Sequence, residues 1–414
     1  MILFYLLISQ MPLDQDPTWG KFLGVATLIK YLGLLCVFYA LFHMASRRSS
    51  PRYLQTIEAR LYIVYLLFAF ISYWFMGPEF SLRSSPFISF LSMAFLFFVV
   101  LTIVDTIPRL RWTLLVAVGS MGWASLYVVR EWMRDPYWRP GSIAGDANYF
   151  ALDACLVLPL AFLFVWRSRI SWERIFALGC LVATIGSTML GGSRGGFLAI
   201  GAAFLWILWH SPHRIRNFLF LIVLIVPPLL FTPFSPVRRL IHPRYSDVTG
   251  TNDRIFAWRA GLRMIEAHPL LGIGLGEFKP QMQRYADPGV GFSSIAHNTY
   301  LEVAAETGLP NFLVFVAMLF FTYRSLGRVR RQASNSGPPI IYLAATALQA
   351  SFAGYFVGAF FLSSEYMKLF WLWMFLSMLL PSFLPARGET GESERPQPTA
   401  SISADTEPTV VNVF

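Results

Sequence analysis

The polar residues between His297 and Glu306 stand at the start of a long apolar stretch, and their types can do acid–base chemistry. A neutral imidazole at His297 can accept a proton from a hydroxyl group near pH 7, and this role needs no metal ion. Asn298, Glu302 and Glu306 recur every four residues, so they share one face of a predicted helix. Because intramembrane carboxylates normally face a bundle interior, these three side chains could orient His297, bind sugar hydroxyls or pair with Arg194 or Arg254.

A glycine cluster at residues 191–196, with the sequence GGSRGG, contains the second group of candidates. The apolar stretch around it has about the length of two short spans, which predicts a hairpin tip at the cluster. Glycines let backbone N–H groups approach a ligand, while Arg194, next to Ser193, offers a guanidinium group for an anion. The alternative interpretation is a simple turn whose arginine reaches lipid headgroups.

The third candidate, Arg254, lies in a polar stretch of the chain before His297. Thr251 or Asn252 is predicted to cap an amphipathic helix that holds Arg254 near its start. One face of this helix is expected to contain Ile255, Trp258, Leu262 and Ile265. The glycine-rich residues 272–276 that follow are interpreted as a backbone shape requirement, because no strand precedes them as in a dinucleotide fingerprint. Asn148, near the start of another apolar stretch, is predicted to cap that helix.

The elements that position these residues are predicted to be membrane-spanning helices. The chain is 56% hydrophobic and only 14% charged, and apolar runs near the length of a membrane span recur along it. The fold class is therefore an all-α polytopic membrane protein, a bundle of about twelve transmembrane helices with one large periplasmic loop carrying short amphipathic helices. The predicted regions are 1–232 (N-terminal helices), 233–297 (periplasmic loop), 298–384 (C-terminal helices) and 385–414 (disordered cytoplasmic tail).

The formal net charge of +10 is interpreted as a topology signal. Arginines cluster in alternate short connections between the apolar runs, which places those connections and both termini in the cytoplasm. The charge therefore does not indicate a nucleic-acid partner, and no His, Cys or carboxylate spacing indicates a metal site or cofactor. The polar candidates then all face the opposite side of the membrane.

Three elements in order, GGSRGG, then NDRIFAW with HPLLGIGLGEF, then AHNTYLEVAAETGLPNF, together resemble the O-antigen ligase and polymerase superfamily. The stretch GDANYFAL at residues 145–152 is also similar to that family, and the resemblance covers roughly residues 141–321. These proteins are bacterial inner-membrane glycosyltransferases that use undecaprenyl-diphosphate-linked glycans. By position, the resemblance implies that Arg194 and Arg254 bind the diphosphate and that His297 is the essential histidine. The very short first apolar segment departs from the family pattern.

The implied reaction moves a glycan from undecaprenyl diphosphate to an acceptor hydroxyl in the periplasm, with inversion and without a metal ion. The acceptor could be a lipid A core, a growing polysaccharide or a protein, so a polysaccharide polymerase of the same superfamily is one alternative. A second alternative is a membrane transporter, because some superfamily members resemble inorganic-carbon transporters. A transporter should show ionisable residues or broken helices near mid-membrane, whereas the sequence places its charges near span ends. A structural scaffold would give Arg194, Arg254 and His297 no special role.

Overall fold

The computed structural model describes residues 1–13, 28–46, 56–77, 86–135, 140, 146–231 and 245–384, and the regular elements in these ranges are all helices. The first part of the chain forms α1 (Ile2–Gln10), η1 (Met11–Leu13), α2 (Leu28–Ser46), α3 (Ile57–Met76), α4 (Pro86–Ile103), α5 (Ile107–Arg134), α6 (Ala147–Arg167), α7 (Ser171–Gly191), α8 (Arg194–His210) and α9 (Arg214–Phe231). The second part forms α11 (Tyr245–Ala267), α12 (Phe278–Tyr285), α13 (Thr299–Ser336), α14 (Pro339–Gly358), α15 (Lys368–Leu379) and η3 (Leu380–Phe383). The tail predicted to be disordered, 385–414, lies outside the described residues.

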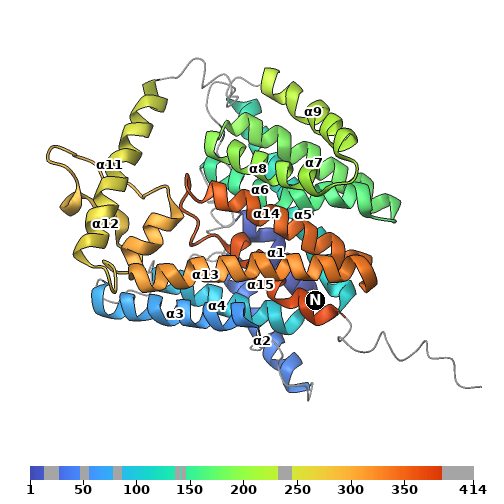
Figure 1. The fold of residues 1–414 in the computed structure, drawn as a ribbon, viewed down its shortest axis with the longest axis horizontal. Coiled ribbons are helices and arrows are strands. Elements are labelled where there is room, and N and C mark those ends of the chain that lie inside the picture. The colour runs from blue at the N-terminus through green and yellow to red at the C-terminus, as the bar shows by residue number, and fades with distance from the viewer. Residues whose placement is uncertain are drawn as a thin grey trace, which may run out of the picture.

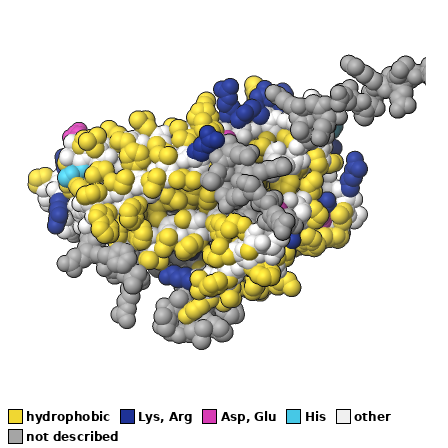
Figure 2. All heavy atoms as spheres, turned by 90° about the horizontal axis from the view of Figure 1, so that it is seen from below, with side chains coloured by type: hydrophobic (Ala, Val, Ile, Leu, Met, Phe, Trp, Pro, Cys, Tyr) yellow, Lys and Arg dark blue, Asp and Glu magenta, His cyan; other side chains and the backbone are white. Residues whose placement is uncertain are grey.

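Eight of the described helices, α2 to α7, α13 and α14, are long and apolar enough to cross a membrane. Three shorter apolar segments accompany them: α1 with η1, α8, and α15 with η3. Figure 2 shows that hydrophobic side chains cover most of one face of the bundle, a surface that hydrocarbon rather than water can solvate. The prediction of an all-α polytopic membrane protein is confirmed, while the number of about twelve spans and the periplasmic loop stay predictions.

Helices α6 and α14 lie at the centre of the bundle (Figure 1), where 78% of each spanning window is buried, against 22% for the peripheral α2. A Cβ at Gly354 of α14 would lie 2.5 Å from Cys155 Sγ and 2.6 Å from the Ala199 carbonyl oxygen. Small residues of this kind let membrane helices approach closely. The Trp373 indole of α15 donates to the Leu156 carbonyl of α6 at 2.9 Å. The helices that carry the candidate site therefore share a tightly packed centre.

Helix α13 is broken at Gly308, whose φ of 84° and ψ of 164° are not helical. A Cβ there would lie 2.2 Å from the Leu270 carbonyl oxygen, so both the conformation and the close approach require glycine. The break separates a short first segment at one end of the bundle from a long span. That span continues to Ser336, and the arginines, glutamine and alanine near its end are strong helix formers.

Helices α11 and α12 stand together at one end of the bundle, beside the start of α13 (Figure 1). The predicted cap at Thr251 or Asn252 is wrong, because α11 already begins at Tyr245. Of the residues predicted to share one apolar face, Ile255 and Leu262 are exposed, at 43% and 55%. The buried face instead contains small residues and one methionine, namely Ala257, Ala260, Gly261 and Met264. Their small size lets α11 pack closely against α13, which hydrophobicity alone did not predict.

Candidate functional site

The glycine cluster forms the turn between α7 and α8, as predicted. Gly192 has a φ of 58°, in the left-handed region that favours glycine. The Ser193 hydroxyl caps α8 by accepting the Gly196 N–H at 3.2 Å, and it donates to Asn148 Oδ1 at 2.7 Å. These two bonds place Arg194 at the start of α8, beside the first turn of α6.

The first turn of α6 differs from the prediction in its capping residue. Asp146, not Asn148, is the cap: its carboxylate accepts the Asn148 N–H at 2.7 Å. A carboxylate is a strong acceptor at a helix N-terminus, so it takes the role that the sequence pattern assigned to the amide. The Asn148 side chain is thereby left to bind Ser193 and to join α6 to α8.

His297 occupies a tightly held turn before α13. Its φ of 48° lies in the left-handed region, and it is the only non-glycine residue with positive φ in the described part of the chain. The Trp258 indole donates to the Ala296 carbonyl at 2.8 Å, and the Asn298 side chain caps α13 by accepting the Leu301 N–H at 3.1 Å. An unusual backbone conformation fixed from both sides is a frequent feature of functional sites.

Arg254 precedes Trp258 by four residues, so the two side chains share a face of α11. The pKa of His297 is lowered from its ordinary value, first because burial disfavours the charged imidazolium and second because Arg254 repels it. Asp146 acts in the opposite direction. Because Arg254 and Asp146 both influence the pKa of His297, the three side chains lie near one another. The lowered pKa keeps the imidazole neutral near pH 7, so it can accept a proton.

The segment between α14 and α15, residues 359–367, connects the two halves of the site. At one side, a Cβ on Gly195 would lie 2.8 Å from Phe361 Cβ, so this segment touches the start of α8. At the other, the Thr299 N–H donates to the Ala359 carbonyl at 2.8 Å and the Thr299 hydroxyl contacts Ser364 Oγ at 2.7 Å. Arg194 and His297 therefore belong to the same end of the bundle, on either side of one segment.

The two predicted glutamates are buried on the inward face of α13, each 3% exposed. Glu302 accepts hydrogen bonds from the Ser363 hydroxyl and from the Ala296 N–H, next to His297. This carboxylate ties the histidine turn to the 359–367 segment. Of the predicted roles, orienting His297 agrees best with these contacts.

Glu306 has a different set of partners, in the glycine-rich loop between α11 and α12. Its carboxylate accepts the N–H groups of Gly276 at 2.8 Å and Phe278 at 3.1 Å, and the Tyr366 hydroxyl at 3.1 Å. Gly276 has a φ of 79°, and a Cβ there would lie 1.9 Å from Pro86 Cγ. The predicted backbone shape requirement is confirmed at this loop, which Glu306 fastens to the bundle.

Sequence reasoning missed two acids inside the bundle, Asp153 of α6 and Glu365 of the 359–367 segment. Both line an internal cavity, and Glu365 is 3% exposed. The prediction that charges gather near the span ends is therefore wrong for these carboxyl groups. A lone acid within an apolar run, as in ALDACLVL at residues 151–158, is a signal of function that could have revealed Asp153.

The candidate site contains cationic and basic side chains, and its described residues form no evident metal-binding group. Within the described ranges, no group of three or more His, Cys, Asp and Glu side chains is placed to hold a metal ion. Arg194 and Arg254 can attract an anion, and a neutral imidazole stands beside Arg254. The chemistry that this arrangement can perform is anion binding coupled to removal of a proton.

Comparison with known proteins identifies the central part of the chain. Residues 179–316 match the family model described as O-antigen ligase, and this region includes every site residue that the sequence predicted. No curated protein matches the chain significantly. The match supports the resemblance inferred from the three sequence motifs: residues 179–316 are similar to O-antigen ligases, in a chain with eight described helices that are long and apolar enough to cross a membrane.

Proposed function

We propose that the protein transfers a glycan from undecaprenyl diphosphate to an acceptor hydroxyl at the periplasmic face of the bacterial inner membrane. The observation that carries this proposal is the left-handed turn that holds His297 at the start of α13, close enough to Arg254 for the guanidinium charge to lower the imidazole pKa. A transferase of this class needs a base for the hydroxyl and cations for the diphosphate, and both are present at one end of the bundle. The family match supports ligase or polymerase chemistry in general.

In this mechanism, Arg194 and Arg254 bind the diphosphate of the donor. The acceptor oxygen attacks the anomeric carbon from the opposite face while the bond between that carbon and the phosphate oxygen breaks, so the configuration inverts. The electron pair of the broken bond stays on the diphosphate, where guanidinium groups stabilise the developing charge. His297 takes the hydroxyl proton. Fixing both substrates beside one another supplies the proximity contribution to the rate.

The remaining predicted residues position these groups. Ser193 caps α8, which begins at Arg194. Asn298, next to His297, caps α13. Glu302 holds the histidine turn and Glu306 holds the glycine-rich loop. In this proposal these side chains fix the backbone on which the reacting groups are held. They do not bind substrate directly, because most of their hydrogen-bonding atoms already have partners in the protein. The acceptor could be a lipid A core, a growing polysaccharide or a protein.

Transport of a small solute is the second candidate, and the interior carboxyl groups favour it. Asp153 and Glu365 line a cavity within the bundle, and α13 is broken at Gly308. Buried ionisable groups and interrupted helices are common in secondary transporters. Under this alternative, Arg194 and Arg254 would attract an anionic solute and His297 would have no catalytic role.

The decisive experiment measures glycan transfer by protein in nanodiscs supplied with undecaprenyl-diphosphate-linked glycan and a panel of acceptors. His297→Ala should lower the rate about a hundred-fold or more, because the acceptor loses its general base. His213→Ala is the matched control, since His213 is exposed in the connection between α8 and α9 and should be neutral. Chelators should leave the rate unchanged.

Equal transfer by wild type and His297→Ala would remove His297 from the mechanism. If the folded wild type transfers to no acceptor, uptake by protein reconstituted into sealed vesicles becomes the next measurement. Uptake that depends on Arg254 but not on His297 would then support transport over transfer.

A further inference from the structure

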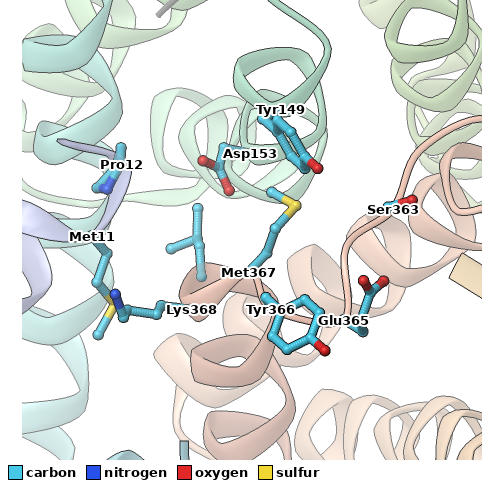
Figure 3. Close-up of a pocket in the computed structure, with 10 residues that line it drawn as sticks. Met11, Pro12, Tyr149, Asp153, Ser363, Glu365, Tyr366, Met367 and Lys368 are labelled. Carbon is cyan, nitrogen blue, oxygen red and sulfur yellow. The ribbon is translucent and has the colours of Figure 1, made fainter. Parts of the chain in front are cut away.

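A cavity of about 120 Å³ with both polar and apolar walls lies next to the segment that connects the two halves of the site. Figure 3 shows its walls: Tyr149 and Asp153 from α6, Ser363 and Glu365 from the 359–367 segment, Lys368 from the start of α15, and Met11 from η1. The volume is several times the roughly 10–15 Å³ that one ordered water requires. The cavity can therefore admit a ligand larger than water.

Residues that line the cavity on two sides neighbour or bind residues of the candidate site. Tyr149 follows Asn148, whose side chain binds Ser193 beside Arg194. Ser363 donates to Glu302, the residue that holds the turn of His297. Asp153 lies six residues beyond the start of α6, which puts it about 9 Å below that helix end. A ligand bound in the cavity would reach from the arginine and histidine groups toward the interior.

Two carboxyl oxygens in the cavity have no partner among the described residues. Glu365 Oε2 is buried in a side chain that is only 3% exposed, and Asp153 Oδ1 is buried likewise. In Figure 3 the two carboxyl groups come from different walls, one from α6 and one from the 359–367 segment. A buried acceptor without a donor is costly, so the cavity is built to receive hydrogen-bond donors from something that enters it.

The character of the lining selects the class of ligand. Burial favours the uncharged form of both acids, and uncharged carboxyl groups suit hydroxyl groups better than phosphate oxygens, for which Lys368 is the one cation in the lining. Carboxyl groups can accept or donate hydrogen bonds, as can the Tyr149 and Ser363 hydroxyls, and the Lys368 ammonium group can donate to ring or hydroxyl oxygens. Aromatic and apolar side chains complete the walls, as is usual in small-molecule sites.

We propose that this cavity binds one sugar ring through its hydroxyl groups, with Asp153 and Glu365 as acceptors. The ring belongs either to the glycan of the donor, next to its diphosphate, or to the end of the acceptor, next to the attacking hydroxyl. This inference rests on the proposed transfer reaction for the source of the sugar. The cavity then determines which sugar is used, separately from the groups that bind diphosphate and remove the proton.

The kinetic test compares Asp153→Asn and Glu365→Gln with wild type, because these changes keep the side-chain volume but replace the carboxyl group with an amide. Each should raise the KM of the substrate whose sugar enters the cavity about ten-fold, as expected when a hydrogen bond to the sugar is lost and its buried partner is left unsatisfied. The inhibition constant of undecaprenyl diphosphate without glycan should not change. A higher KM for the donor identifies the donor sugar, and a higher KM for the acceptor identifies the acceptor sugar.

Glu58→Gln is the matched control, because Glu58 is also buried, at 3% exposed, with an unpartnered oxygen. It lies in α3 fourteen residues before Ser72, which contacts Glu306, and so about 21 Å from the site. Its variant should retain the wild-type KM for both substrates. Unchanged KM values in Asp153→Asn and Glu365→Gln would overturn the proposal, as would equal increases in Glu58→Gln.

A second measurement does not depend on transfer. Carbodiimide modification of Asp153 and Glu365, followed by mass spectrometry, should be slowed by glycan-bearing donor or by acceptor, but not by undecaprenyl diphosphate alone. Equal protection by undecaprenyl diphosphate alone would assign the cavity to lipid or diphosphate, and no protection by any substrate would mean that it holds only water. Either result overturns the sugar site. Protection by a sugar in a protein that transfers nothing would refute the proposed reaction while supporting the cavity.

Discussion

The two ends of the bundle both contain acids and arginines, but their hydrogen bonds differ. Where α5 and α7 begin, the Arg111 guanidinium binds both oxygens of Glu173 at 2.7 Å, and Asp105 binds Arg109 at 2.7 Å and His43 at 3.1 Å. Where α8 and α13 begin, Glu302 and Glu306 instead accept from hydroxyl and backbone N–H groups, although Asp287 nearby, after α12, also binds arginines of α11.

The charged groups at the first end have a structural role, and we propose a functional role for those at the second. At the first end, opposite charges largely cancel and hold neighbouring helices together. At the second, carboxylates shape the backbone around the arginines and the histidine, and the positive charge of Arg254 is strong enough to lower the pKa of His297. Similar residue types therefore have different kinds of partners at the two ends, and we propose a chemical role for those at the second.

The most demanding test of this comparison removes one arginine from each end of the bundle. Arg194→Ala should lower transfer about a hundred-fold or more, because a donor to the leaving group is lost while the fold remains. Arg194→Lys should recover only part of the rate, since an ammonium group lacks the bidentate geometry. Arg111→Ala should keep the rate and lose stability instead, by about 3 kcal/mol, because Glu173 is 1% exposed and loses its ionic partner.

These variants are compared by initial transfer rates and by thermal unfolding in the same detergent. If Arg111→Ala lost transfer without losing stability, or Arg194→Ala unfolded without a specific loss of rate, the two ends would not differ in the way described.

A smaller effect is expected from Glu306, which shapes the site without contacting the reacting atoms. Glu306→Ala leaves the Gly276 and Phe278 N–H groups without their acceptor, so the glycine-rich loop should loosen and the transfer rate should fall about ten-fold. Glu306→Gln keeps one acceptor oxygen and should be milder. Hydrogen exchange of the loop, measured beside the rate, should rise in both variants in the same order. Normal exchange with a lost rate would instead indicate direct contact with substrate.

The smallest predicted effect is a shift in the pH profile. Transfer should decline as pH falls through the pKa of His297, which lies below its usual value, because the protonated imidazole cannot act as a base. Asp146 raises that pKa, so Asp146→Asn should move the decline to lower pH by less than about one unit, while asparagine still caps α6. Asp287→Asn, in an acid bound to Arg259 and Arg263, should not move it. A shift to higher pH in Asp146→Asn would contradict the assignment.

Much of the architecture could be predicted from local sequence features. Long apolar runs require helices in a membrane, because backbone groups must find partners within their own segment. The turn at GGSRGG and the shape requirement of the glycine-rich loop followed from glycine alone, since few other residues accept those conformations. The order of the motifs also indicated the family whose model matches residues 179–316.

Contacts between distant segments could not be predicted in this way. Apolar periodicity put Ile255 and Leu262 on one face of α11 but did not show which face packs on the bundle, and the fold buries small residues of this helix, because close helix packing depends on the shape of the partner. The cap of α6, the partners of Glu306 and the cavity around Asp153 and Glu365 likewise depend on segments far apart in the chain. The sequence by itself thus determined the helices and the chemical groups, while the tertiary structure decided which groups meet, because hydrogen bonds and burial depend on neighbours in space.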